Sequence, residues 1–215
     1  MTTRLPMFPL GSLLLPYGIL PLHIFEPRYR VLMFDCTREG AVPEFGVILI
    51  ERGSEVGGND ERFSIGTVGR IAEAGEMPDG RWLLTLVGTR RIRVQEWLPD
   101  DPYPLALVDD LPDLPWPAKL DREAGDAEEA LRSTEQLVRL TLALTAELGE
   151  AAPPDSIKLS EDPKVAAWQL TAIAPLGPFD KQRLLQIDDH AERLRLLASM
   201  AEEERAVLAY RLAGD

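Results

Sequence analysis

Histidine and cysteine, the side chains that most often act in catalysis or bind metals, are scarce in this chain. The 215 residues contain two histidines, His23 and His190, and one cysteine, Cys36. A zinc site normally needs three or four ligands at defined spacing, and a nucleophilic cysteine needs a base beside it. The sequence offers neither pattern. We therefore expect no metal site, and structural roles for His23 and Cys36.

Motifs for nucleotide chemistry and for nucleic-acid binding are also weak. The glycine-rich loop G-x-x-x-x-G-K-[ST], which binds ATP phosphates, does not occur. Arg90, Arg91 and Arg93 form one short basic cluster. We expect this cluster to be a solvated strand face, because an RNA-binding surface needs a broader basic patch with stacking aromatic residues. We predict that the chain is not an enzyme and requires no cofactor.

The overall charge points away from anionic partners. The chain has 23 basic and 36 acidic residues and a formal net charge of −13. Such acidity repels phosphate backbones and anionic membranes, so nucleic acid and membranes are unexpected partners. Pro6, Pro9, Pro16 and Pro21 interrupt what would otherwise resemble a signal peptide. The single cysteine fits a reducing compartment, and we predict a cytoplasmic protein.

The first thirty residues are apolar yet rich in proline. Proline fixes φ and has no amide donor, so neither a continuous helix nor a central strand fits this stretch. It predicts a short strand over 5–10, an ordered apolar crossing over 13–25, and a helix that begins at Pro27. An apolar crossing of this length must be covered by a core or by a partner. Function is therefore expected in what this region contacts.

The rest of the first half is typical of β structure. Short runs rich in valine, isoleucine, leucine and aromatics, separated by turn signals, predict strands over 5–10, 45–51, 63–73, 82–88, 90–97 and 105–109. The turn signals include Gly57–Asp60 and Asp79-Gly80, the latter typical of a hairpin. One helix, over 27–38 and ending near Gly40, interrupts the strands.

The second half is predicted to be helical. Residues 111–117 contain three alternate prolines and predict a stiff, extended connector. The expected helices run from about 121 to 149, from 163 to 174, over 178–187 and from 190 to 212. In the first of them, one face is expected to carry Leu137, Thr141, Leu144 and Leu148. We predict an α+β chain with two subdomains, residues 1–117 and 118–215.

Several motifs resemble one known family. The sequences L-P-M-F-P-L at 5–10 and P-L-H-I-F-E-P-R-Y at 21–29 resemble the opening of the Lon protease substrate-binding (N-terminal) domain. Further pieces match in order at 45–49, 65–71, 78–88 and 180–185. The resemblance implies a PUA-like curved antiparallel sheet or barrel with one inserted helix, followed by a C-terminal helical bundle. The ATPase and peptidase modules of Lon have no counterpart in these residues, which implies a stand-alone form.

From the resemblance we expect a non-catalytic protein that binds unfolded or degron-like polypeptides. A shallow apolar groove or an exposed strand edge could capture such segments. The candidate binding residues are Leu14, Tyr17, Ile19 and Leu20 in the apolar crossing, with Met77 at a hairpin tip. Gly18 is expected to permit a turn that exposes its two neighbours. The alternative is that these residues are core or ordinary surface.

Three other possibilities remain open at this stage, one of which is that the chain is a fragment of a longer protease. The chain could be an adaptor or regulator that docks onto a separate ATP-dependent protease. It could also be a small-molecule or RNA-binding module, as some PUA-like proteins are, although its acidity argues against RNA. The sequence makes no prediction of oligomeric state.

Overall fold

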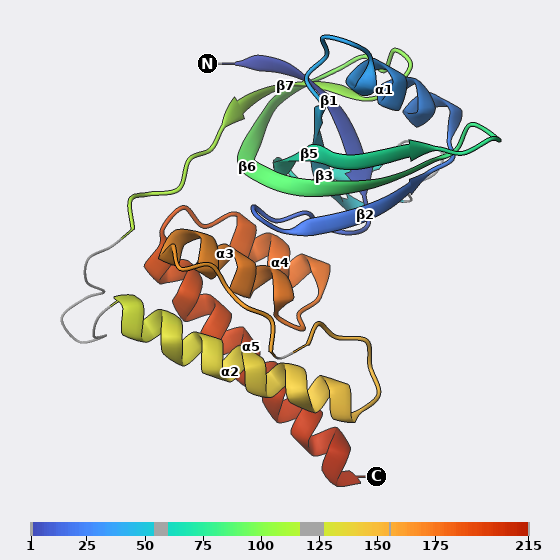
Figure 1. Ribbon diagram of the computed structural model, residues 1–215. Helices are drawn as coiled ribbons and strands as arrows, with labels where there is room; N and C mark the ends of the chain where they lie inside the picture. Colours follow the sequence, from blue (N-terminus) through green and yellow to red (C-terminus); the bar gives the residue numbers. More distant parts are fainter. Residues whose placement is uncertain (1, 54–59, 117–126, 155, 215) are drawn as a thin grey trace. The chain divides into compact units, whose positions relative to one another are not determined.

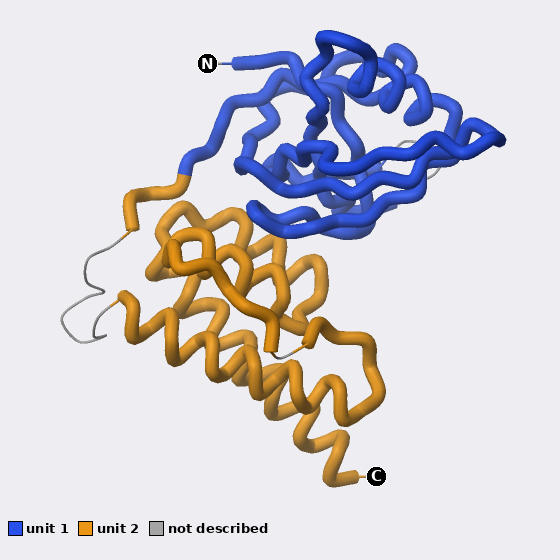
Figure 2. The backbone as a smooth tube through the Cα atoms, viewed as in Figure 1, with its two compact units in different colours: residues 1–112 blue, residues 113–215 orange. Residues whose placement is uncertain are grey.

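The computed structural model describes residues 2–53, 60–116, 127–154 and 156–214. The turn signal at Gly57–Asn59, the residue Pro117 and the helix start expected near residue 121 lie outside these ranges. The chain divides into two compact units, residues 1–112 and 113–215 (Figure 2). We call them the β unit and the helical unit, and each is described by itself.

The β unit is a strongly curved sheet with one helix (Figure 1). Its elements are β1 (Thr3–Leu10), β2 (Ile19–Ile24), α1 (Pro27–Thr37), β3 (Glu44–Arg52), β4 (Glu61–Arg62), β5 (Ile65–Glu76), β6 (Trp82–Leu98) and β7 (Leu105–Asp110). The strand order β1-β7-β6-β5-β3 closes on itself because β1 also pairs with β3. The β1–β3 pair is parallel, and the other described strand pairs are antiparallel. The predicted α+β fold, with its curved antiparallel sheet and inserted helix, is confirmed.

Two of the predicted strands are one continuous strand. The sequence predicts strands over 82–88 and 90–97, whereas β6 runs unbroken through Gly88. The first half of β6 lies between β2 and β5, and its second half lies between β5 and β7. A Cβ atom at Gly88 would overlap the carbonyl oxygen of Leu15, so this glycine allows another backbone segment to approach. The glycine therefore marks a close backbone approach inside a strand.

Strand β2 lies inside the segment that the sequence predicts as an ordered apolar crossing, residues 13–25. It pairs with β6, Pro21 standing opposite Thr85, and no other described strand pairs with it. Proline is tolerated at the edge of a sheet when its nitrogen points away from the ladder. The proline argument correctly excluded a central strand, but it did not exclude an edge strand.

The β unit has its core between α1 and the inner face of the sheet. Tyr29, Leu32 and Met33 of α1 pack there with side chains that include Phe8, Phe45, Leu84 and Leu86. A second cluster, from the strands alone, contains Leu5, Met7, Ile48, Val68, Ile92, Ala106 and Val108. Burial of this apolar surface holds the sheet in its curved form.

The helical unit contains α2 (Ala127–Glu147), α3 (Pro163–Ile173), α4 (Pro178–Leu185) and α5 (His190–Gly214). Asp162 caps α3 by accepting a hydrogen bond from the Lys164 amide at 2.9 Å. The Glu192 amide likewise donates to Asp189 at 2.9 Å at the start of α5. Side-chain caps of this kind satisfy amides that the first helical turn leaves unpaired. None of the described helices is long and apolar enough to cross a membrane.

The buried face of α2 differs from the predicted one. Leu137, Leu144 and Leu148 are only half-buried, whereas the buried residues include Thr134, Val138, Thr141, Leu142 and Thr145. The Thr141 and Thr145 hydroxyls donate to the carbonyls of Leu137 and Thr141, at 2.8 and 2.9 Å. Threonine can be buried here because its hydroxyl is satisfied within its own helix. The predicted face therefore included the buried Thr141, but it was centred too far toward the leucines.

The connector is anchored to the helical unit. Residues 111–116 belong to no helix or strand, and Asp113 accepts hydrogen bonds from Trp168 Nε1 and Arg193 Nη2, each at 2.7 Å. The Arg193 guanidinium also lies 3.5 Å over the centre of the Trp168 ring. We call Asp113, Trp168, His190 and Arg193 the anchor cluster. Because Asp113 packs with the helices, the unit boundary falls after residue 112, whereas the sequence places it after 117.

The anchor cluster should make stability depend on pH. Burial, followed by the nearby Arg193 charge, lowers the pKa of His190 below its usual 6.5. As pH falls through 6.5, the His190 imidazole takes up a proton in the unfolded chain before it does so in the folded chain. The free energy of unfolding therefore decreases. We expect the helical unit to lose stability from pH 7 to pH 5.5, measured as the urea midpoint by circular dichroism. A His190→Gln variant should show a flatter dependence in this window, and an equally steep one would contradict the assignment.

Candidate functional site

The solvent side of β2, β5 and the first half of β6 forms one surface, which we call the outer face. Side chains alternate along β2, with Ile19, Pro21 and His23 exposed and the residues between them turned toward the core. The register places Thr85 of β6 between Pro21 and Glu73, and Leu83 between His23 and Gly75. The outer face is thus built from β5 and β6 of the closed sheet and from β2, which is attached to the edge of β6.

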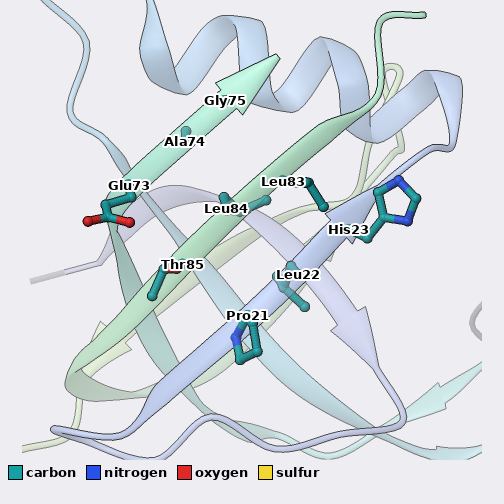
Figure 3. A pocket seen from close by; sticks show the side chains of 9 residues that line it. All are labelled: Pro21, Leu22, His23, Glu73, Ala74, Gly75, Leu83, Leu84 and Thr85. Atoms are coloured by element: carbon teal, nitrogen blue, oxygen red, sulfur yellow. The ribbon is translucent and has the colours of Figure 1, made fainter. Parts of the chain in front are cut away.

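A shallow open groove of about 580 Å³ lies on the outer face (Figure 3). Its lining residues are Pro21, Leu22, His23, Glu73, Ala74, Gly75, Leu83, Leu84 and Thr85. In Figure 3, Pro21, Thr85 and Glu73 follow one another across the strands, with Leu83 and His23 beside them. Gly75 adds no side chain to the surface, which leaves the groove open at this point.

Large apolar side chains are exposed on and beside this groove. Ile19 is 72% exposed and Leu83 is 53% exposed. Phe25, directly after β2, is 54% exposed, and its ring centre lies 6.1 Å from that of His23. Single exposed apolar residues are ordinary, but a group of them on one surface is typical of a binding site.

The turn that leads into β2 holds a strained residue. The Gly18 amide donates to the Leu15 carbonyl at 2.9 Å, which closes a turn with Pro16 in its second position. Tyr17, rather than Gly18 as expected from the sequence, has the left-handed φ of +58°. The Tyr17 amide donates to the Gly88 carbonyl at 2.8 Å, which fixes the turn against β6. A left-handed conformation is costly for a non-glycine residue and often marks a functional position.

The hairpin between β5 and β6 ends the outer face. The Met77 amide donates to Arg81 at 2.7 Å, and the Gly80 amide donates to Met77 at 2.8 Å. Gly80 has a φ of +78°, as expected for the Asp-Gly turn signal. Alternation from Glu73 and Gly75 places Met77 in the same row, where it is half-buried. Met77 therefore lies at the end of the outer face.

The five predicted binding residues separate into two groups. Tyr17 and Ile19 are exposed and Met77 is half-buried, all on or next to the outer face. Leu14 is 1% exposed within the core and Leu20 packs against that core, so neither presents its side chain on this surface. Leu14 is therefore a core residue. Leu20 turns inward because side chains alternate along β2. Leu14, which precedes β2, is buried because it packs closely against Gly69 and Gly88.

Sequence reasoning missed four residues of this surface, namely His23, Phe25, Glu73 and Leu83. The missing signal was the alternation of Ile19, Pro21, His23 and Phe25 with apolar core residues, which is the pattern of an edge strand. Once β2 is recognised, its partner strand β6 contributes Leu83 to the same side of the sheet.

The outer face carries charges of both signs. Glu73, opposite Thr85, and Arg70, opposite Val87, are exposed on it, and the Glu73 carboxylate belongs to no ion pair within the part of the chain that the structure describes. At the hairpin tip, a hydrogen bond from the Arg81 backbone amide lowers the pKa of Asp79. Below the groove, burial raises the pKa of Tyr29 to about 12, so this phenol is neutral at physiological pH. With one exposed charge of each sign, the outer face selects partners mainly by its apolar side chains.

The basic cluster is not the solvated face that the sequence suggested. Arg90 forms hydrogen bonds to both carboxylate oxygens of Glu44, at 2.8 and 3.1 Å, and to Asp110 at 2.9 Å. Arg91 is 2% exposed and donates to the Pro112 carbonyl. A bulge in β6 opposite β5 turns Arg91 into the protein. Two of the three arginines are thus used to hold the β unit together.

The described residues offer no group of three or more histidine, cysteine or acidic side chains that could hold a metal ion. On the outer face, Glu73 and His23 belong to different rows, and no hydrogen bond connects them. The arrangement combines exposed apolar side chains, a shallow groove and the exposed Glu73 carboxylate. It is suited to binding another chain rather than to acid–base chemistry on a small molecule.

Comparison with known proteins identifies the family. The family described as the ATP-dependent protease La (LON) substrate-binding domain matches residues 4–203. The chain belongs to this family. Its relatives include Lon protease 2 of Myxococcus xanthus, 28% identical over 206 residues, and Lon protease of Parabacteroides distasonis, 31% identical over 211 residues. These alignments cover 95% and 94% of the chain but 24% of each protease.

The chain therefore spans about a quarter of the length of these Lon proteases. Two solved structures are similar over most of the chain. The Lon N-terminal domain protein from Xanthomonas campestris is 32% identical, with a TM-score of 0.61, and the match covers 92% of this chain and 98% of that one. The N-terminal domain of a Mycobacterium avium complex Lon protease has a TM-score of 0.64 at 18% identity and supports the fold. The resemblance to the Lon substrate-binding domain is confirmed.

Proposed function

We propose that the chain binds unfolded or degron-like polypeptides through its outer face and performs no catalysis itself. The observation that carries this proposal is the group of exposed apolar side chains at the groove, led by Ile19 and Leu83. The family to which the chain belongs is described as substrate-binding, and the corresponding substrates of a protease are polypeptides.

The shape of the groove favours a polypeptide over a small molecule. Small-molecule sites are usually deep and bury most of their ligand. This groove is open along the strands and lined by side chains and backbone of β2, β6 and β5. An extended segment can lie along such a surface and contact apolar positions without entering a cavity.

The RNA alternative has little support in the structure. The chain has a net charge of −13, and Arg90 and Arg91 already have protein partners. A protein that binds phosphate backbones needs accessible basic side chains. The groove instead carries Glu73, which would repel phosphate.

Removing the apolar anchors should weaken polypeptide binding. We expect the double variant Ile19→Ser, Leu83→Ser to bind labelled, reduced and carboxymethylated α-lactalbumin about 5- to 150-fold more weakly, corresponding to about 1–3 kcal/mol for interface hot spots. Both side chains are exposed, so the fold should be retained. Fluorescence anisotropy measures the affinity, and circular dichroism with thermal melting checks the fold.

The matched control is the double variant Phe34→Ser, Val42→Ser. These side chains are 65% and 67% exposed and also belong to the β unit, but they line no part of the groove. The control should bind like the unmodified chain. Equal losses in the two double variants would show that the outer face has no special role.

A further inference from the structure

The inference concerns the free edge of β2 and rests on the proposed function. The Gly88 amide donates to the Gly18 carbonyl at 2.9 Å, and the register continues from this pair along β2 and β6. Hydrogen-bonded and non-hydrogen-bonded pairs alternate along an antiparallel ladder. Every second residue of β2, counted from Gly18, therefore bonds to β6. The residues between them direct their backbone groups to the other side.

The outward-directed residues are Ile19, Pro21 and His23. Within the part of the chain that the structure describes, no strand pairs with this side of β2. The edge presents two amide donors, from Ile19 and His23, and three carbonyl acceptors, from all three residues. Unpaired donors and acceptors at strand spacing are a template for a further β-strand.

A small apolar pocket opens beside the same edge. It has a volume of about 170 Å³, and its lining includes Phe8, Leu10, Leu22, Ile24 and Tyr29. Leu22 and Ile24 are the β2 residues that face the core. A strand that pairs with β2 would direct alternate side chains to this side of the sheet. One large apolar side chain of that strand could then enter the pocket.

We infer that β2 binds its polypeptide by strand addition. An extended segment pairs with the free edge through Ile19, Pro21 and His23, and it places one apolar side chain in the pocket beside Leu22 and Ile24. The main-chain hydrogen bonds provide affinity with little dependence on sequence, and the pocket selects an apolar residue. The exposed Glu73 carboxylate can accept a hydrogen bond from a basic side chain of the segment.

A second copy of this chain is a poorer occupant of the edge. If two β2 strands paired antiparallel about their centres, Pro21 would stand opposite Pro21 of the partner subunit. Neither proline has an amide to donate, so the central pair of hydrogen bonds would be lost. A segment of another protein that has any residue other than proline at this position can donate its backbone amide to the Pro21 carbonyl.

The test uses a labelled nine-residue peptide in which threonine alternates with leucine, isoleucine and valine, with lysine at each end. Two further peptides carry N-methyl groups on the amides of either the odd- or the even-numbered residues. One set of amides faces β2 and the other faces solvent, so we expect one methylated peptide to bind at least about tenfold more weakly and the other to bind like the parent. Replacing the central leucine by alanine should also weaken binding if the pocket is used.

The protein offers a matched pair of variants. His23→Pro removes one outward donor without touching the ladder to β6, whereas His23→Ala keeps the amide and removes the imidazole. Because both variants lack the imidazole and only the proline variant lacks the amide, we expect His23→Pro to bind the parent peptide about tenfold more weakly than His23→Ala does. Circular dichroism checks the fold. If His23→Pro does not fold, the methylated peptides test the inference on the unmodified chain.

The outcomes separate the two proposals. If neither the parent peptide nor carboxymethylated α-lactalbumin binds, the proposed function fails. If the parent peptide binds but the two methylated peptides bind equally, polypeptide binding stands and strand addition is wrong. If sedimentation shows that the unmodified chain forms dimers that His23→Pro abolishes, the occupant of the edge is a second copy, which overturns the assignment to a foreign segment.

Discussion

Asp113→Ala is expected to lower the free energy of unfolding of the helical unit by about 3–5 kcal/mol. Arg193 is 1% exposed and donates to Asp113 Oδ1 at 2.7 Å. Removing the carboxylate leaves a buried positive charge without its counter-ion, which is far costlier than losing an exposed ion pair. Trp168 also loses the acceptor of its indole N–H. Urea unfolding followed by circular dichroism measures the loss.

Two further variants serve as controls for Asp113→Ala. Glu150→Ala breaks the Glu150–Arg211 pair, whose side chains are both about half exposed, and should cost at most about 1 kcal/mol. The double variant Asp113→Leu, Arg193→Met removes both charges and should recover much of the stability lost in Asp113→Ala. If Asp113→Ala costs no more than Glu150→Ala, the anchor cluster does not hold the connector to the helices.

Gly88→Ala is expected to lower the free energy of unfolding of the β unit by about 1–3 kcal/mol. The added Cβ would overlap the Leu15 carbonyl oxygen and also approach the Leu15 carbonyl carbon at 2.9 Å. A backbone group cannot rotate away as a side chain can, so β6 and the Leu15–Gly18 turn must separate. The Tyr17 amide would then lose its bond to the Gly88 carbonyl. Because this turn leads into β2, polypeptide binding should weaken as well.

Gly75→Ala is the matched control for stability. Gly75 lies in β5 of the same sheet, and apart from Gly75 itself and its two chain neighbours no residue has an atom within 4 Å of where its Cβ would be. Alanine in an open strand position should be neutral or slightly stabilising. Urea unfolding by tryptophan fluorescence compares the two variants, since Trp82 and Trp97 belong to β6. Equal stability of the two variants would mean that the close approach at Gly88 is not required.

Much of the local structure could be predicted from the sequence. Pro27 begins α1, Asp162 caps α3, and Gly149 follows α2 with a φ of +73°. Each of these signals acts within one turn of its own position, so neighbouring residues suffice to define it. The order of strands followed by helices, and hence the α+β class, follows from the same local patterns.

Contacts between distant segments decided what the sequence left open. The proline-rich segment became a strand because Ile19–Ile24 pairs with residues 82–87, more than fifty positions away. Arg91 and His190 are polar residues that would be expected at the surface from the sequence alone, yet both are buried. Arg91 is bound to the backbone of the connector, and His190 lies against Arg193. The residues that neighbour Arg91 and His190 in the sequence do not predict these contacts.

The candidate site, too, could be predicted only in part from the sequence. The sequence by itself determined that an apolar segment near the N-terminus has more apolar surface than a loop normally exposes, and it named Tyr17 and Ile19 within it. Only the tertiary structure decided that Leu14 fills the barrel while Ile19 and Leu83 face solvent. The physical reason is that successive side chains of a strand point to opposite faces, so function depends on which face the folded barrel encloses. The free edge of β2 is likewise a property of the sheet, because an edge exists only once the other strands have paired.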